Sequence, residues 1–198
     1  MEGLVDLAVI TRVLQSVSIH QNQIRRRTSS GGKSRILQKL HGYNQAAKFA
    51  DWLILLDLDQ DDECAPGYLR SVLPAPSTGM MLRIPVREIE TWLLADQEKM
   101  ANFLGINSAN FPDNPESLND PKGFLIDLVN RKCPQRYRQL RKDLLPVPES
   151  AKVVGPYYPD RIASFAEKHW RAEVAAERSD SLARCIRALE ELKRQSVQ

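Results

Sequence analysis

The sequence predicts an α/β fold, in which a parallel sheet flanked by helices is followed by a mainly helical region. Residues 52–58 read Trp-Leu-Ile-Leu-Leu-Asp-Leu, a continuous apolar run typical of a strand that is buried on both faces of a parallel sheet. Segments with helical spacing alternate with β-prone runs up to about residue 95. Beyond it, eight prolines separate short helical pieces and no convincing strand follows. We therefore expect an α/β core over residues 1–95 and a helical, proline-punctuated region over 96–198 that packs on it.

The first segments predict two helices joined by a basic loop. Leu7, Ile10 and Leu14 share one face of a helix over residues 4–14. A short β-prone stretch, 16–20, follows. Residues 21–33 are polar and basic and end in Ser-Ser-Gly-Gly-Lys, which predicts a loop and the best place for contacts to phosphate. Apolar residues recur at helical spacing over 34–49, at Ile36, Leu37, Leu40 and Ala47.

Three further elements follow the apolar run at 52–58. Residues 80–86 predict a second short strand. Residues 88–95 continue as a helix with Ile89, Trp92 and Leu93 on one face. The last element, 181–195, is an amphipathic helix, because its apolar residues fall on one stripe; they are Leu182, Ile186, Leu189 and Leu192.

Charge is segregated along the chain, although the net charge is only +3. Residues 7–50 contain eight basic residues and no acid, whereas residues 51–63 contain six acids and no base. Such segregation suits a site that holds a polyanion beside a cluster of carboxylates. A patchy surface that serves only solvation would look the same.

Composition excludes several classes of protein. The chain has three cysteines, far apart, and three scattered histidines, so neither a disulfide framework nor a zinc motif is predicted. No apolar run approaches the roughly 20 residues of a membrane helix, and the first residues do not resemble a signal peptide. We expect a cytoplasmic protein that does not contact a membrane.

The strongest local signal for chemistry is Asp57-Leu58-Asp59-Gln60-Asp61. Three carboxylates at alternate positions past a strand end can converge on Mg²⁺, or on Mn²⁺, which both prefer oxygen ligands. An EF-hand would need glycine where Asp62 stands and glutamate where Tyr68 stands, and a haloacid-dehalogenase phosphatase would place this string on its first strand. A glycosyltransferase with a metal-bound sugar nucleotide stays open, as does the reading of these residues as solvated turn formers.

Two neighbouring segments suggest further ligands. Glu88 and Glu90 lie at a strand-to-helix junction, and two such residues in a regular helix cannot both face one point; we therefore expect Glu88, nearer the strand end, to join the site. Gly31-Gly32-Lys33-Ser34 lacks the first glycine and the preceding strand of a P-loop. We expect phosphate contacts from the basic residues there, which are Arg25, Arg26, Arg27, Lys33 and Arg35. Four more could extend the track: Arg136, Arg138, Arg141 and Lys142.

Several of these residues resemble a known fold. Glu2-Gly3 before a helix and Asp57-Leu58-Asp59 after a buried strand resemble the two signatures of the Toprim fold of topoisomerases, primases and overcoming-lysogenization-defect nucleases. The segment 87–96, with Asp120-Pro121-Lys122, Gly155-Pro156-Tyr157 and residues 179–182, is similar more narrowly to an uncharacterised Toprim-like family. The narrower resemblance spans nearly the whole chain. The narrower resemblance implies a bacterial protein whose gene lies beside ATPase genes in a defence-like setting.

The resemblance implies roles for individual residues. Glu2 would act as a general acid or base, Asp57 and Asp59 would hold Mg²⁺ for phosphoryl transfer, and Asp61 would be a third ligand. In Toprim proteins the glutamate ends a first strand, whereas here only Met1 precedes Glu2. We therefore expect a truncated first strand, through a misplaced start or through loss. Its loss would leave Glu2 without a strand to hold it in position.

Together these expectations predict a Mg²⁺-dependent nuclease that cleaves the phosphodiester bonds of DNA or RNA in bacterial defence or repair. The alternative is a non-catalytic Toprim-like subunit that binds nucleic acid or docks on a partner ATPase. A glycosyltransferase ranks third, because the acid-free basic stretch has no evident use with a sugar donor.

Overall fold

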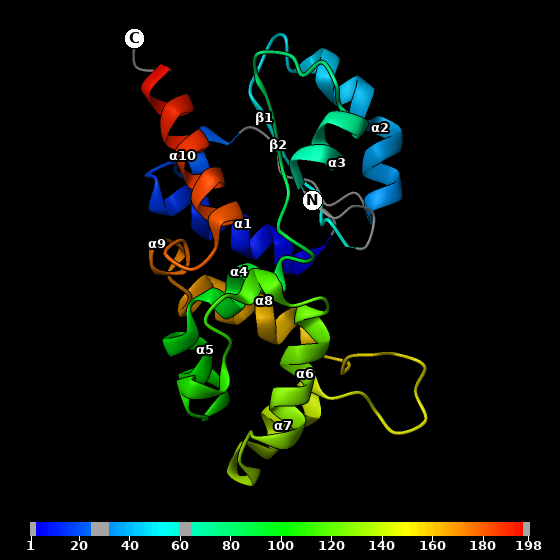
Figure 1. The fold of residues 1–198 in the computed structure, drawn as a ribbon, viewed down its shortest axis with the longest axis vertical. Coiled ribbons are helices and arrows are strands. Elements are labelled where there is room, and N and C mark those ends of the chain that lie inside the picture. Colours follow the sequence, from blue (N-terminus) through cyan, green and yellow to red (C-terminus); the bar gives the residue numbers. More distant parts are fainter. Residues whose placement is uncertain (1–2, 25–31, 60–64, 196–198) are drawn as a thin grey trace.

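The structure is a computed structural model, which describes residues 3–24, 32–59 and 65–195. It is α/β and mostly helical, with the two strands and helices α2 and α3 at one end and the remaining helices below and beside them (Figure 1). The helices are α1 (Leu4–Ser16), α2 (Lys33–Ala46), α3 (Ala65–Val72), α4 (Glu90–Ala95), α5 (Gln97–Leu104), α6 (Pro121–Arg131), α7 (Arg138–Leu144), α8 (Tyr158–Lys168), α9 (Ala172–Ala175) and α10 (Asp180–Gln195). Short 3₁₀ turns lie at Gln21–Gln23, Ser108–Asn110, Pro115–Ser117 and Gln135–Tyr137.

The sheet of the described residues has two parallel strands, β1 (Trp52–Leu55) and β2 (Met80–Arg83). Trp52 lies opposite Met80, and the register is kept to the last pair. The two segments stay hydrogen-bonded past the strands, because the amide of Leu58 donates to the carbonyl of Pro85 at 3.3 Å. The predicted parallel pairing is thus confirmed, in strands shorter than expected.

Both faces of β1 are covered, which explains its continuous apolar sequence. Ile54 and Leu56 pack with Ile36 and Leu40 of α2 in one hydrophobic cluster. Leu55 points the other way and joins the main core with α1 and α4. Because successive side chains of a strand alternate between faces, a strand between two helical layers needs apolar residues at every position.

The main core is helical and gathers segments from both ends of the chain. Trp92 of α4 and Trp170 are fully buried, and the Trp170 indole nitrogen donates to the Trp92 carbonyl at 3.1 Å. Helix α1 packs against α8 and α9 in this core, rather than among the elements next to it in sequence. The division of the chain near residue 95 stays a prediction.

Two local predictions are wrong in detail. Residues 16–20 form no strand, because the chain turns at Ser18 with a φ of 59°. The helix predicted from Glu88 begins at Glu90, since Arg87 has a φ of 66° and redirects the chain between strand and helix. The predicted helices over 34–49 and 181–195 are confirmed within a few residues as α2 and α10.

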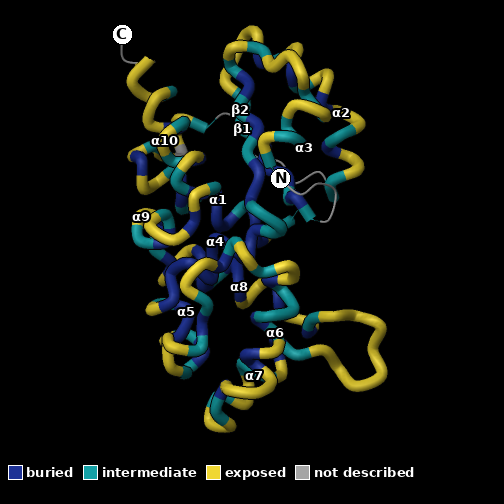
Figure 2. The backbone as a smooth tube through the Cα atoms, viewed as in Figure 1, coloured by how far each residue is buried: buried dark blue, intermediate teal, exposed yellow. Residues whose placement is uncertain are grey.

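Exposure is concentrated in one segment, between α7 and α8. Residues 146–153 are almost all exposed and form a wide excursion from the body of the molecule (Figure 2). None of the described helices has the length and apolar character needed to cross a membrane.

Candidate functional site

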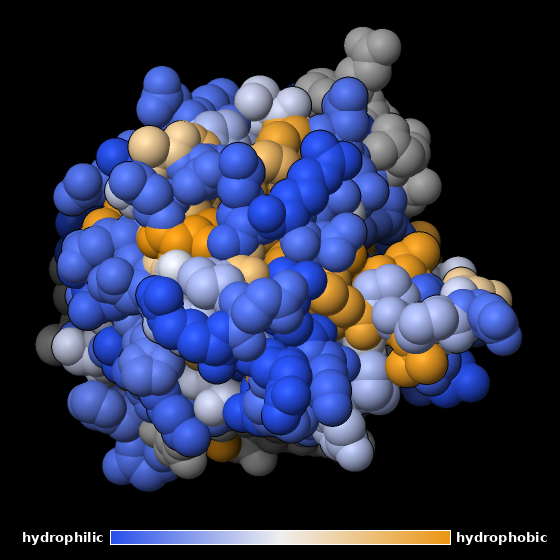
Figure 3. All heavy atoms as spheres, turned by 90° about the horizontal axis from the view of Figure 1, so that it is seen from below, coloured by the Kyte–Doolittle hydropathy of each residue, from blue (hydrophilic) through white to orange (hydrophobic). Residues whose placement is uncertain are grey.

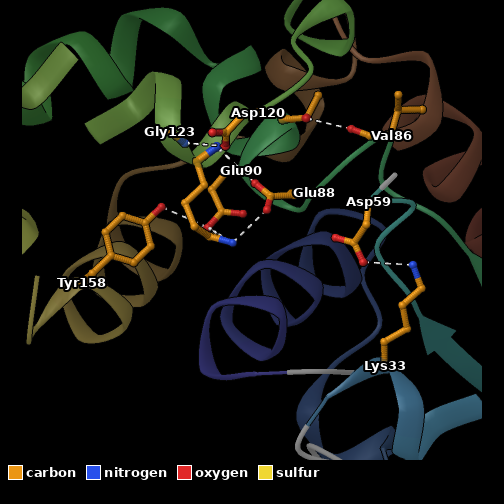
Figure 4. A network of polar contacts seen from close by, with 10 residues as sticks. Lys33, Asp59, Val86, Glu88, Glu90, Asp120, Gly123 and Tyr158 are labelled. Carbon is orange, nitrogen blue, oxygen red and sulfur yellow. Dashed lines mark hydrogen bonds and ion pairs between the residues drawn. The ribbon is translucent and has the colours of Figure 1, made fainter. Parts of the chain in front are cut away.

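The candidate site lies where β1 and β2 end. Asp57 and Asp59 follow β1 and Glu88 follows β2, so the parallel strands bring all three carboxylates to one edge of the sheet. Figure 4 shows Asp59 and Glu88 in this region. Ligands of open α/β sheets bind at this edge. The structure therefore places three of the predicted ligands in one region.

Lys33, the first residue of α2, ties that helix to the end of β1. Its ammonium group lies 3.0 Å from Asp59 Oδ2 and donates to the carbonyl oxygens of Asp57 and Leu58. It also lies 4.9 Å from the centre of the Tyr68 ring, a cation–π distance. The Lys33 side chain is only 13% exposed, so its charge is directed at the strand end rather than at solvent.

Asp59 and Arg87 close the strand ends with reciprocal hydrogen bonds. The Asp59 amide donates to the Arg87 carbonyl at 2.7 Å, and Arg87 Nη1 donates to the Asp59 carbonyl at 2.9 Å. Both residues have left-handed backbone conformations, with φ of 52° and 66°. Such conformations cost free energy in residues other than glycine and persist where surrounding contacts hold them.

Glu88 and Glu90 meet at Lys122, contrary to the expectation that they cannot face one point. Lys122 Nζ lies 3.1 Å from Glu88 Oε1 and 3.6 Å from Glu90 Oε1, and the Lys122 amide donates to Glu88 Oε2. The expectation assumed a regular helix over both residues. Because the helix begins only at Glu90, Glu88 is free to turn towards the same lysine.

Glu90 is buried, with 2% of its surface exposed, and is bound from a distant helix. The Tyr158 hydroxyl donates to Glu90 Oε1 at 3.0 Å, across 68 positions of sequence. Among the described residues no hydrogen-bond partner reaches Glu90 Oε2. Burial raises the pKa of Glu90 above its ordinary value, although the charge of Lys122 acts to lower it.

Lys122 stays charged in this setting. Burial acts to lower its pKa, but Glu90, Glu88 and Asp57 together raise it above the ordinary value. Asp57, half-buried at the end of β1, thus acts on the same lysine as the two glutamates. The carboxylates at the strand ends thus interact electrostatically with Lys122 at the start of α6.

Sequence reasoning missed Lys122, Glu90 and Tyr158 as members of this region. Asp120 begins α6 by accepting from the amide of Gly123 at 2.7 Å, with Pro121 in the first position, a pattern that predicts a helix start. A lysine in the first turn opposes the helix dipole. This unfavourable position is the sequence feature that could have indicated carboxylate partners for Lys122.

Several predicted site residues lie outside the described residues: Glu2, Arg25, Arg26, Arg27 and Asp61. Of the described ones, Arg35 is exposed on α2. Among the described residues, no three side chains of the types that ligate metals lie close enough to hold an ion.

Another segment in the predicted resemblance has a packing role. Ser179 and Ser181, at the start of α10, both donate to Glu116 Oε1, at 2.6 and 2.7 Å. The Ser181 hydroxyl also accepts from the indole nitrogen of Trp92 at 2.7 Å. This network fixes α10 to α4 and lies away from the strand ends.

Comparison with known proteins adds no family to this geometry. No protein-family model, curated protein or solved structure matches the chain significantly.

Proposed function

We propose that this chain is a Toprim-like, Mg²⁺- or Mn²⁺-dependent nuclease that hydrolyses phosphodiester bonds of nucleic acid. The observation that supports this proposal is that Asp57, Asp59 and Glu88 follow the ends of two adjacent parallel strands, at one edge of the sheet. Carboxylates at this edge suit a hard cation that also binds phosphate oxygens. The resemblance to Toprim-like families supports the same chemistry, in a bacterial defence or repair setting.

In this proposal Asp57 and Asp59 hold the cation, completed by Glu2 and Asp61. When bound, the cation would activate water and stabilise the leaving oxygen. The chain's own groups prepare the site. Lys33 holds the segment 57–59 in place through its carbonyl oxygens, and Lys122 binds and positions Glu88 at the neighbouring strand end.

The basic segment before the site would bind the phosphate backbone. Arg25, Arg26 and Arg27, with Lys33 and Arg35, supply the charge, and their contacts would weaken as salt is raised. Lys33 contacts the strand end in this structure, so its part is to join the phosphate-binding segment to the carboxylates.

The test compares cleavage of labelled single- and double-stranded DNA and RNA with Mg²⁺ or Mn²⁺. Asp57→Asn and Asp59→Asn should abolish cleavage, because each removes a charge from the cation site. Asp51→Asn is the matched control, since Asp51 is exposed and precedes β1 at its opposite end. Unchanged cleavage by Asp57→Asn would remove the proposal.

A second candidate is a non-catalytic subunit that binds nucleic acid or a partner ATPase. It is favoured by the lysines on two of the carboxylates, Lys33 on Asp59 and Lys122 on Glu88. Titration calorimetry separates the two candidates. The nuclease should bind Mg²⁺ in a manner that Asp57→Asn abolishes, whereas the subunit should show no carboxylate-dependent binding.

A further inference from the structure

A second cationic region lies at the end of the molecule farthest from the sheet. Between Asp127 and Asp143 the sequence holds six basic residues and no acid. All of them except Arg141 are exposed: Arg131, Lys132, Arg136, Arg138 and Lys142. Figure 3 views the molecule from this end and shows hydrophobic side chains at the surface between strongly hydrophilic ones.

Arg138 and Lys142 border a groove of about 510 Å³. Its lining combines cationic and apolar groups, from α7 and the segment that follows it: Gln135, Arg138, Arg141, Lys142, Leu145, Pro146, Val147 and Pro148. The volume lies within the range of ligand sites in proteins, about 300–1,000 Å³. The groove is thus lined by both positively charged and aliphatic side chains.

The frame of the groove is held by internal contacts. Arg141 Nη1 donates to the carbonyl of Cys133 at 3.0 Å and to those of Val129 and Asn130, all at the end of α6. Gly155 donates to the Leu144 carbonyl at 2.8 Å and packs so closely on this backbone that a Cβ would not fit. Arg141 is therefore a structural residue, and Arg138 and Lys142 carry the exposed charge.

Exposed apolar residues recur in the segment that follows α7, and Val147 among them lines the groove. Five large hydrophobic residues are exposed among the described ones, and Val147, Val153 and Tyr157 belong to the segment after α7. The aliphatic side chains of the lining offer nothing to a phosphate backbone. The described lining residues include no aromatic ring on which a base could stack. The mixture favours a peptide over nucleic acid.

We propose that this groove docks an acidic segment of a partner protein that also carries leucine or valine side chains. Its carboxylates would meet Arg138 and Lys142, while its apolar side chains would lie on Leu145, Pro146 and Val147. Complementary charge speeds and orients such encounters, and the buried apolar groups provide the affinity. The proposal is independent of whether the strand ends cleave nucleic acid.

The test uses fluorescence anisotropy with the full chain and three labelled probes. The first is a short peptide of aspartates and glutamates that flank leucines, the second has serine for each leucine, and the third is a single-stranded oligonucleotide. The first should bind more tightly than the second. Arg138→Glu with Lys142→Glu should weaken its binding at least about tenfold, and Val147→Ser should weaken it several-fold.

Controls separate the groove from overall charge and from the proposed nuclease site. Lys168→Glu with Arg178→Glu makes the same charge change at exposed positions outside the groove, and should leave peptide binding unchanged. Cleavage of nucleic acid should survive Val147→Ser, because Val147 lines the groove and has no part in the proposed cation or phosphate sites. Equal binding of both peptides, or loss of oligonucleotide binding in the Arg138 and Lys142 variant without any peptide binding, would overturn the proposal.

Discussion

Asp59 and Arg87 exchange two hydrogen bonds across the ends of the parallel strands, at 2.7 and 2.9 Å, while both hold left-handed backbone conformations. The pair ends the sheet and directs the chain towards Glu88. The strained backbone and the carboxylates of the candidate site thus occupy the same few residues, a coincidence common where a fold positions functional groups.

This arrangement predicts different outcomes for two substitutions of Arg87. Arg87→Ala should lower the free energy of unfolding by about 1 kcal/mol, because it removes the hydrogen bond to the Asp59 carbonyl but keeps the backbone strain. Arg87→Gly should cost less, since glycine adopts a positive φ without a Cβ clash. Urea denaturation followed by tryptophan fluorescence measures both. A glycine variant no more stable than the alanine variant would contradict the argument.

The buried carboxyl of Glu90 predicts a dependence of stability on pH. Its pKa is raised above the ordinary value of 4.5, so the native state binds the proton more tightly than the unfolded chain. The stabilisation from this proton is complete below pH 4.5 and is lost as pH rises through the native pKa. Glu90→Gln carries no such proton. The stability of the wild type relative to this variant should therefore fall as pH rises from 4 towards neutral.

Urea denaturation at a series of pH values measures this difference. Glu177→Gln, at an exposed position, is the matched control, and its difference from the wild type should stay nearly constant. A constant difference for Glu90→Gln as well would show that Glu90 has an ordinary pKa.

Removal of Arg171, the partner of the buried Asp96, should greatly lower the free energy of unfolding. The side chain is fully buried and accepts from Arg171 at three positions, its amide, Nε and Nη2, at 2.7–3.0 Å. Arg171→Ala should cost about 3–5 kcal/mol, because it leaves a buried carboxylate without its cation. Arg184→Ala breaks an exposed pair with Asp180 and should cost less than about 1 kcal/mol. Thermal and urea unfolding compare the two, and similar losses would contradict the prediction.

The thiol of Cys185 should react only when the protein unfolds. It is fully buried in α10, and burial raises its pKa to about 12. Only the thiolate reacts with disulfide reagents. In a variant with Cys64→Ser and Cys133→Ser, labelling should require urea and follow the unfolding transition. Rapid labelling in native buffer would show that α10 opens locally.

The sequence determined those features whose cause is local. A run of apolar residues at 52–56 specifies a strand covered on both faces, since every side chain must avoid water. The stripe of α10 specifies which face of the helix packs inward, with Leu182 and Leu189 fully buried, and Asp120-Pro121 specifies where α6 begins. The position of Asp57 and Asp59 beyond the strand follows from the same pattern.

Only the tertiary structure decided which of these elements meet. Glu88 and Lys122 are 34 positions apart, Glu90 and Tyr158 are 68 apart, and α1 packs with α8 near the other end of the chain. Periodicity encodes whether a side chain is buried, but the partner of a buried charge depends on how whole helices pack. The carboxylates at the strand ends could therefore be predicted from the sequence, whereas the pairing of Lys33 with Asp59 and of Lys122 with Glu88 could not.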